Sequence, residues 1–194
     1  IAYLVAGLGG LAAPLFVTIF GWGLVRSKST TNGNIIKATI LLLLQLLVNL
    51  FSPHLFDPLT PGILSLFALL ILIKPLIVNM ANNNISFLVF SISIFLIYGL
   101  SSFIYNIQGT SDWDSRVSTN NLTILVSHLF FTGTYPLFPW ITFAVVGAFL
   151  GSSITEGGKT LPRNNTTLLL IIIGMSYCLV SVSYTHLRAH ETQR

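Results

Sequence analysis

"HLFFTGTYPLFPWITF" (residues 128–143) combines a histidine, a tyrosine, two prolines and a tryptophan at the start of an apolar run that continues to about residue 154. Prolines disrupt helix interiors, but at the start of a helix the missing N–H costs little, because the first four N–H groups have no intrahelical partners. Tyrosine and tryptophan are typical of membrane interfaces, where an apolar ring and a polar tip are both favourably placed. The stretch therefore predicts a helix over residues 136–154 that enters a lipid bilayer at Pro136.

The composition of the whole chain supports this membrane interpretation. Of the 194 residues, 53% are hydrophobic and 7% are charged, and the mean hydropathy is +0.83. Soluble domains carry about 25% charged residues, and a water-soluble core of this size could not bury so much apolar surface. The net charge of +4 comes without a basic patch interleaved with aromatic residues, so nucleic acid is not an expected partner. The expected partner is the lipid bilayer.

Six segments are apolar enough to cross a bilayer, or nearly so, since a spanning helix needs about 20 residues. They are residues 1–25, 35–52, 60–79, 85–106, 136–154 and 166–183. A further segment, 122–134, is too short to cross and predicts an interfacial or re-entrant helix that leads into the next span. We therefore expect an all-α, polytopic transmembrane helical bundle that forms a single domain over residues 1–183.

Both ends of the sequence are unusual. The chain starts with the apolar stretch "IAYLVAGLGG" and has no methionine before Met80, so it is expected to be a fragment that lacks one or more upstream spans. The last residues, "SYTHLRAHETQR" (183–194), resemble the translated sequencing-adapter read-through of metagenomic sequences. Residues 184–194 are therefore expected to be an artefactual or disordered tail. His186 and His190 in this tail have helical ligand spacing, but no third ligand accompanies them, so no metal site is expected.

Basic residues near the span ends predict the orientation, because cytoplasmic loops of membrane proteins are enriched in lysine and arginine. They gather after the first span, near the end of the third span and before the last span; these residues are Arg26, Lys28, Lys37, Lys74, Lys159 and Arg163. If those connections are cytoplasmic, loops 53–59 and 107–121 face outside.

Small and polar residues within the spans are interpreted as packing features. Small residues recur at helical spacing in the span 136–154, namely Ala144, Gly147, Ala148 and Gly151, and such a face lets helix backbones approach closely. Gln45 and Asn49 are one helical turn apart and so face the same way. Amides inside a membrane commonly hydrogen-bond neighbouring helices, but the alternative that these two line a polar cavity stays open.

Chemical candidates gather on the predicted outer side. His128 is ionisable and has apolar neighbours, which is typical of a functional group such as a general base, but also of a ring that hydrogen-bonds a neighbouring helix. The densest charge is the group Asp112, Asp114 and Arg116. Paired carboxylates can perform acid–base chemistry, whereas an exposed loop with an Asp–Arg pair is the simpler alternative. No nucleophile-elbow, Walker or dinucleotide-binding motif is present.

A family resemblance starts from the same stretch. "LFFTGTYPLFPWITFAVVGAFLG" (129–151) resembles the Thr-Gly-x-Tyr-Pro-x-x-Pro-Trp signature of membrane proteins related to heparan-alpha-glucosaminide N-acetyltransferase. This group is allied with the YeiB-like proteins of unknown function and, more distantly, with integral membrane acyltransferases. "APLFVTIFGWGLVRSKS" (13–29) is similar to a family span that ends in small and then basic residues, and "TPGILSLFALLILIKPLI" (60–77) is similar to its Gly-Ile-Leu span. Together the match covers most of residues 10–155.

The resemblance implies an acyltransferase in a prokaryotic plasma membrane. It implies that an acyl group, taken to be acetyl, passes from cytoplasmic acyl-CoA as donor to a sugar-like or other small-molecule acceptor on the outer side, without a metal. The implied catalytic residues are His128 and Tyr135, and the implied substrate-binding residues are Trp140, Asp112, Asp114, Arg26 and Lys28. Among these, Arg26 and Lys28 would meet the CoA phosphates at the cytoplasmic side.

Other hypotheses stay open beside the acyltransferase. The chain is a transporter or channel module if Gln45, Asn49 and the proline-marked helix ends line a substrate path. It is a non-catalytic membrane subunit if its polar residues serve packing alone. Relatives commonly carry an earlier span with an acidic–Arg–Gly motif that this sequence does not contain, so the fragment itself is expected to lack a catalytic span.

Overall fold

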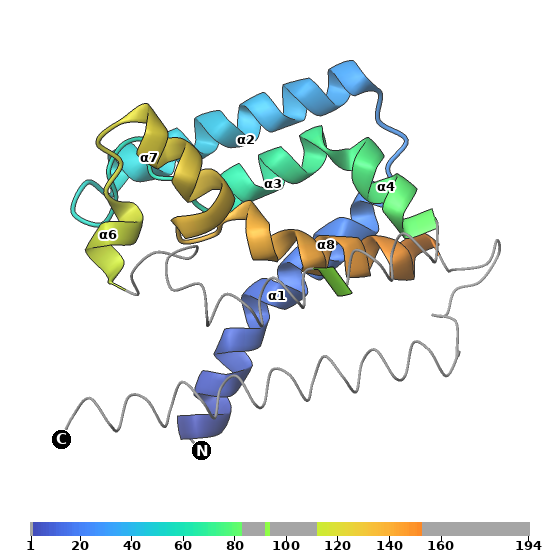
Figure 1. Ribbon diagram of the computed structural model, residues 1–194, viewed down its shortest axis with the longest axis horizontal. Coiled ribbons are helices and arrows are strands. Elements are labelled where there is room, and N and C mark those ends of the chain that lie inside the picture. The colour runs from blue at the N-terminus through green and yellow to red at the C-terminus, as the bar shows by residue number, and fades with distance from the viewer. Residues whose placement is uncertain (1, 83–91, 94–111, 153–194) are drawn as a thin grey trace. The chain divides into compact units, whose positions relative to one another are not determined.

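The computed structural model describes residues 2–82, 92–93 and 112–152, and every regular element in these ranges is helical (Figure 1). The elements are α1 (Ala2–Arg26), α2 (Thr31–Phe51), α3 (Ile63–Leu72), α4 (Lys74–Asn82), α6 (Trp113–Val117), α7 (Leu122–Ser127), the π-helix η1 (His128–Thr132) and α8 (Leu137–Ser152). Residues Val17–Ser152 form one compact unit, and the first part of α1, up to Phe16, belongs to a second unit. For the described residues, the expected all-α fold is confirmed.

The predicted spans are recovered in part. In the described part of the chain, α2 alone is long and apolar enough to cross a membrane, and the number rises to three if the bent pairs α3–α4 and α7/η1–α8 each count as one span. The C-terminal portion of α1, Ala12–Arg26, is a shorter apolar helix. The predicted spans 85–106 and 166–183, the tail 184–194 and the basic residues Lys159 and Arg163 lie outside the described residues. The arrangement of six spans therefore stays a prediction.

The helix α2 begins at Thr31, four residues before the predicted start at residue 35. Thr30 has extended backbone angles (φ −74°, ψ 163°), and its hydroxyl accepts a hydrogen bond from the backbone N–H of Gly33 at 3.2 Å. This is the geometry of a threonine N-cap, which satisfies one of the free N–H groups at a helix start. Residues 31–34 thus form the first turn of the helix. They are mostly polar and lie outside the predicted apolar span, but the N-cap hydrogen bond of Thr30 favours a helix start at this point.

The burial pattern of α2 is the reverse of that in a soluble helix. Its buried residues are Asn34, Ala38, Gln45 and Asn49. Most of its leucine and isoleucine side chains are exposed, and Phe51 at its end is 79% exposed. Exposed leucine beside buried amide is favourable in hydrocarbon, where apolar surface needs no cover and polar groups need partners inside the protein. The exposed face of α2 is therefore apolar and its buried face carries the amides, which is the pattern expected of a helix in contact with lipid.

The predicted span 60–79 is broken into α3 and α4, whose axes differ by 69°. Ile73 lies at the break with φ −90° and ψ 12°, and Pro75 follows it in the first turn of α4. Proline lacks an N–H, and in a continuous helix its ring would clash with the carbonyl four residues earlier. The bend is therefore a local effect of Pro75, and the assignment of 60–79 to a single uninterrupted helix is wrong.

The start of α8 also differs from the expectation that Pro136 and Pro139 both lie in its first turn. Phe138 has non-helical angles (φ −95°, ψ 114°), and the peptide bond between Phe138 and Pro139 is cis. A residue that precedes proline avoids the α region for steric reasons. The regular part of α8 thus begins at Pro139, and the expectation holds for this proline alone.

The small-residue face of α8 packs directly on the backbone of α1. A Cβ added at Gly21 would lie 2.0 Å from the carbonyl oxygen of Ala144, and one added at Gly147 would come equally close to the backbone of α1. Gly151 lies against Trp22, whose side chain would be 2.8 Å from an added Cβ. Ala144 and Ala148 are fully buried in this contact region. The close approach that the spacing of small residues predicted is confirmed.

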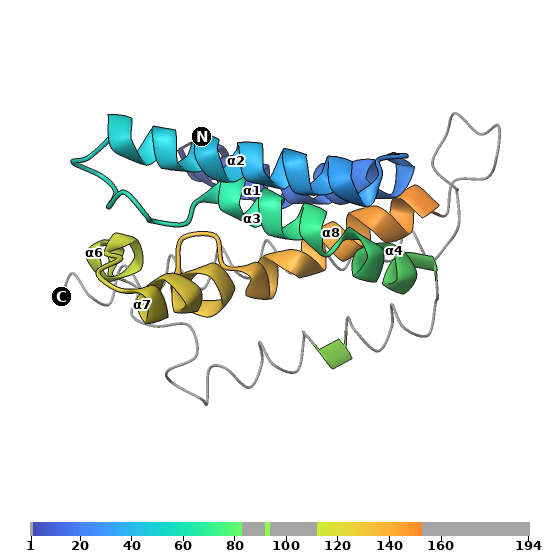
Figure 2. The ribbon, with the colours of Figure 1, turned by 90° about the horizontal axis from the view of Figure 1, so that it is seen from above.

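Within the unit Val17–Ser152, the helices place their connections at two opposite ends (Figures 1 and 2). The segment 52–62 lies with α6 and α7 at one end, which we call the His128 end (Figure 1). The connection 27–30 lies with the last residues of α4 and α8 at the other, which we call the Lys74 end (Figures 1 and 2). The alternation agrees with the predicted order of loops, and the side of the membrane on which each end lies stays a prediction.

Candidate functional site

His128 lies buried in η1, with 5% of its surface exposed. Its Nε2 atom is 3.0 Å from the carbonyl oxygen of Ser118, and its Nδ1 atom is 2.7 Å from Oγ1 of Thr132. Because a carbonyl oxygen can only accept, we assign the proton of the neutral ring to Nε2, which donates to Ser118, so that Nδ1 accepts from the Thr132 hydroxyl. The ring therefore links η1 to the segment that follows α6.

The backbone at His128 forms a π-helical turn. The N–H of Gly133 donates to the carbonyl oxygen of His128 at 3.2 Å, which closes the wider i→i+5 ring. A Cβ added at Gly133 would lie 2.5 Å from that oxygen, so the turn requires glycine at this position. π-turns inside helices occur frequently at functional sites. Here the turn brings Thr132 Oγ1 within 3.1 Å of the Ser127 hydroxyl as well as next to His128.

Buried hydrogen bonds lead from α2 to the His128 end. The Gln45 Nε2 atom donates to Asn49 Oδ1 at 2.9 Å. Asn49 Nδ2 in turn donates to the carbonyl oxygens of Pro58 at 3.0 Å and Thr60 at 2.8 Å. The Thr60 hydroxyl donates to the carbonyl oxygen of Val117. Because these amide donors are bonded inside the protein, Gln45 and Asn49 hold the segment 58–60 in place, and the packing interpretation of the two amides is confirmed.

Two further bonds tie the loops at the His128 end to each other. The backbone N–H of Thr119 donates to Asp57 Oδ2 at 2.7 Å, and the Thr134 hydroxyl donates to the carbonyl oxygen of Pro61 at 3.0 Å. The segments 57–62 and 117–119 are thereby fixed against each other and against the start of α8. His128 therefore lies in a rigid, hydrogen-bonded surrounding.

Tyr135 and Trp140 form an aromatic pair close in sequence to the π-turn. Their ring centroids are 5.2 Å apart and the ring planes are tilted by 52°, and Trp140 also packs on Phe143 at 5.7 Å. All three side chains are partly exposed. Since the hydrogen bonds of His128 go to Ser118 and Thr132, the two predicted catalytic residues take part in different contacts.

Asp112 and Asp114 lie at the start of α6 and are exposed. Asp112 occupies the N-cap position, but its side chain makes no cap hydrogen bond. Ser118 directly follows α6 and accepts the bond from His128. The structure therefore brings the acidic pair to the same end as His128 and leaves both carboxylates facing outward.

Arg26 and Lys28 are exposed at the Lys74 end. Between them, the carbonyl oxygen of Ser27 accepts a hydrogen bond from Lys74 Nζ at 2.6 Å, and Ser29 Oγ lies 3.3 Å from the same ammonium group. The Ser29 hydroxyl donates to Asn34 Oδ1 at 2.5 Å. Lys74 therefore fixes the turn between α1 and α2 that carries the two exposed cations.

The sequence did not single out Ser118, Thr132 or Lys74 as site residues. Thr132 follows His128 by four positions, and this spacing is a local signal that the two side chains can meet on one helix face. Ser118 meets His128 across a chain reversal, and Lys74 meets Ser27 across 47 positions of sequence. No local sequence pattern predicts these two contacts.

In residues 2–82, 92–93 and 112–152, no three His, Cys, Asp or Glu side chains lie together in a way that could hold a metal ion. His186, His190 and Cys178 lie outside these ranges.

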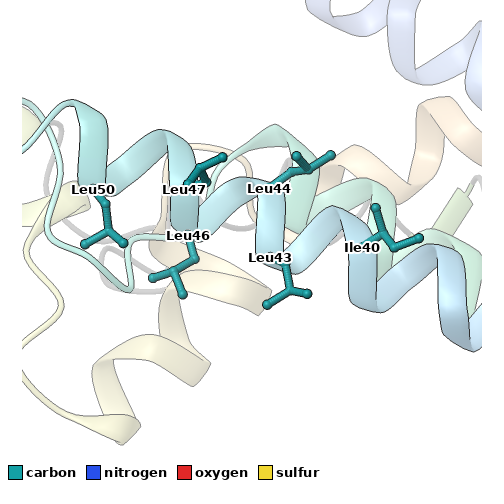
Figure 3. Close-up of a pocket in the computed structure, with 6 residues that line it drawn as sticks. All are labelled: Ile40, Leu43, Leu44, Leu46, Leu47 and Leu50. Atoms are coloured by element: carbon teal, nitrogen blue, oxygen red, sulfur yellow. The ribbon is translucent and has the colours of Figure 1, made fainter.

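An open depression on α2 is lined by six apolar side chains, Ile40, Leu43, Leu44, Leu46, Leu47 and Leu50 (Figure 3). All of them belong to one helix, and none carries a polar group. The depression therefore offers no base, nucleophile or anion contact, and its chemistry suits the acyl chains of lipids.

The family model described as heparan-alpha-glucosaminide N-acetyltransferase, catalytic, matches residues 3–184, which extends beyond the stretches 10–155 that carried the resemblance. No curated protein and no solved structure matched the chain. The match includes the π-turn, the aromatic pair and the Lys74 end. The chain therefore belongs to the family of heparan-alpha-glucosaminide N-acetyltransferase catalytic domains and is an acetyltransferase-like membrane protein.

Proposed function

We propose that the protein transfers an acyl group, acetyl in the simplest case, from acyl-CoA at the Lys74 end to an amine or hydroxyl at the His128 end. The observation that carries this proposal is the family match over residues 3–184, because the family name describes acetyl transfer to a glucosaminide. The acceptor is accordingly a sugar-like molecule or another small molecule with a free amine or hydroxyl.

The donor is assigned to the Lys74 end because this end carries exposed positive charges. Arg26 and Lys28 are exposed there, on a turn that Lys74 holds in place. Guanidinium and ammonium groups form strong, charge-assisted hydrogen bonds with phosphate oxygens. Enrichment in basic residues is also typical of the cytoplasmic side, where acyl-CoA is found.

The acceptor is assigned to the His128 end because its amine or hydroxyl must lose a proton as the acyl carbon bonds to it. His128 supplies a neutral imidazole with a basic Nδ1 atom, and general bases contribute about 10²–10⁴-fold to such reactions. Tyr135, Trp140, Asp112 and Asp114 are proposed as acceptor contacts at the same end. In this proposal the chain crosses a prokaryotic plasma membrane about six times, with the Lys74 end in the cytoplasm.

The transporter alternative loses its main support in the structure. It required Gln45 and Asn49 to line a polar path, whereas their amide donors bond to Asn49, Pro58 and Thr60. We therefore propose acyl transfer alone.

The experiment that tests acyl transfer uses radiolabelled acetyl-CoA and glucosamine. The protein is expressed, reconstituted in liposomes, and assayed for label in the sugar. His128→Gln and Tyr135→Phe are expected to lower kcat/KM, by about 10²-fold for the histidine if it acts as a general base. His54→Gln is the matched control, because His54 is an exposed histidine in a loop at the same end.

Two results would contradict the proposal. Absence of transfer by the wild-type protein to both amine and hydroxyl acceptors would remove the acyltransferase function. Full activity of both variants, with transfer by the wild type intact, would remove His128 and Tyr135 from the site.

A further inference from the structure

We infer that Thr132, and not His128 itself, contacts the acceptor and passes its proton on to His128. The inference rests on the proposed acyl transfer and deepens it by naming the proton path. It starts from one feature of the site, namely that the basic nitrogen of the histidine is already occupied.

Neither ring nitrogen of His128 is open to an acceptor molecule. Nε2 is bonded to the Ser118 carbonyl oxygen at 3.0 Å, Nδ1 is bonded to Thr132 Oγ1 at 2.7 Å, and the residue is 5% exposed. An acceptor that approached Nδ1 directly would have to displace the Thr132 side chain from the interior. The basic lone pair of the site is thus directed at a hydroxyl of the same chain.

The Thr132 hydroxyl has capacity for one more partner. Its single hydrogen goes to Nδ1, so the Ser127 hydroxyl, 3.1 Å away, is the donor in the contact between the two hydroxyls. A hydroxyl oxygen accepts two hydrogen bonds, and Ser127 uses one of them. Thr132 is partly exposed, and the remaining lone pair can accept the N–H or O–H of an acceptor.

This arrangement has the three parts of an activated hydroxyl: the hydroxyl of Thr132, the base His128 and the orienting carbonyl of Ser118. The carbonyl fixes the tautomer by accepting from Nε2, which leaves Nδ1 unprotonated toward the hydroxyl. When the base is protonated, both N–H groups have acceptors, namely the Ser118 carbonyl oxygen and Thr132 Oγ1. Both contacts of the ring are therefore kept while the proton moves.

The proposed step balances as follows. The acceptor nitrogen or oxygen bonds to the acyl carbon of the thioester, and the bond from this carbon to sulfur breaks. The acceptor proton moves to Thr132 Oγ1 while the hydroxyl proton of Thr132 moves to His128 Nδ1. The proton then returns along the same path to the CoA thiolate, which leaves as the thiol.

The test compares Thr132→Val, which keeps the shape but removes the hydroxyl, with Thr132→Ser, which keeps the hydroxyl. Thr123→Val is the matched control, because Thr123 is exposed on the preceding helix α7. For each variant, kcat and KM for glucosamine are measured together with the solvent isotope effect in mixtures of H₂O and D₂O. The thermal unfolding temperature of each variant is measured in the same liposomes.

Thr132→Val is expected to lower kcat by about 10²-fold, the contribution of a general base, with KM changed far less. Thr132→Ser restores most of kcat, and Thr123→Val leaves it unchanged. The isotope effect of the wild type depends non-linearly on the fraction of D₂O, because two protons move in the step, and the residual activity of Thr132→Val shows a linear dependence.

Three results would overturn the relay while leaving acyl transfer in place. The first is wild-type kcat in Thr132→Val together with loss of activity in His128→Gln, since His128 would then act on the acceptor directly. The second is a fall in the activity of Thr132→Val that is fully explained by a smaller amount of folded protein. The third is a linear isotope dependence in the wild type, which is decisive even if Thr132→Val does not fold. Absence of transfer by the wild type would instead contradict the proposed function itself.

Discussion

Gly147 of α8 lies so close to Thr18 of α1 that a Cβ at position 147 would fall 1.8 Å from the Thr18 carbonyl oxygen. The nearest atoms are backbone atoms, which cannot rotate away as a side chain can. The contact between the two helices therefore depends on glycine at this position, as is common for helices that pack in a membrane.

Replacement of this glycine is expected to weaken the fold. Gly147→Ala should lower the free energy of unfolding by about 1–3 kcal/mol or more, because α1 and α8 must separate to admit the methyl group. The measurement is reversible unfolding in mixed micelles with increasing denaturing detergent. Gly23→Ala is the control: its Cβ would meet nothing within 4 Å, and alanine favours the helix by up to about 1 kcal/mol. Equal stability of the two variants would contradict the packing argument.

Loss of the amide at Asn49 should also be costly. Asn49→Leu removes the donor to the carbonyl oxygens of Pro58 and Thr60, and a buried polar group left without a partner costs about 1–3 kcal/mol. Unfolding of the purified protein is the measurement. Thr39→Val on the exposed face of the same helix should change stability by less than about 0.5 kcal/mol. A stable Asn49→Leu variant would show that the segment 58–60 is held by other contacts.

Loss of the Lys74 hydrogen bonds should weaken binding of the acyl-CoA donor, because these bonds fix the turn that carries Arg26 and Lys28. Lys74→Met removes the bonds to Ser27 and Ser29, so the turn that carries Arg26 and Lys28 loses its fixed position. The KM for acetyl-CoA is expected to rise several-fold, with kcat changed little, and Lys74→Arg should recover part of the loss. Lys37→Met, an exposed lysine on α2, is the control for the loss of one positive charge. An unchanged KM in Lys74→Met would place donor binding elsewhere.

The orientation of the chain can be tested by labelling single cysteines. In a Cys178→Ser background, Ser115→Cys lies on α6 and Asn32→Cys in the first turn of α2, and both positions are exposed. A membrane-impermeant maleimide applied to intact cells should label position 115 and reach position 32 only after the membrane is opened. Labelling in the reverse order would invert the proposed direction of acyl transfer.

The presence of helices in these apolar runs could be predicted because length and hydrophobicity are local properties. Predicted spans 1–25 and 136–154 correspond to Ala2–Arg26 and Leu137–Ser152. The bend at Ile73 was missed although Pro75 signals it, since an apolar run with one proline still satisfies a count of apolar residues. The π-turn at His128 was not predicted, although the glycine that it requires, Gly133, lies directly after it in the sequence.

The candidate site was predicted in part for the same reason. His128 stands out locally, as an ionisable residue among apolar ones. Its partner Ser118 does not, since this serine contributes only its backbone carbonyl, which any residue type would supply. The spacing of Thr132 permits a contact with His128 but does not by itself identify the partner. The sequence could therefore single out His128 as a candidate but not all of the atoms that its ring contacts.

Because α2 is a single helix without a break, its tilt should depend on the thickness of the surrounding bilayer. Its 21 residues extend over about 31 Å, close to the roughly 30 Å of an average hydrocarbon layer. The described spans beside it are bent and can adjust their length by flexing, whereas α2 can respond to thicker or thinner lipid only by tilting. Such tilting would move Asn49 relative to the loops at the His128 end, so we expect the acyl-chain length of the surrounding lipids to affect the candidate site.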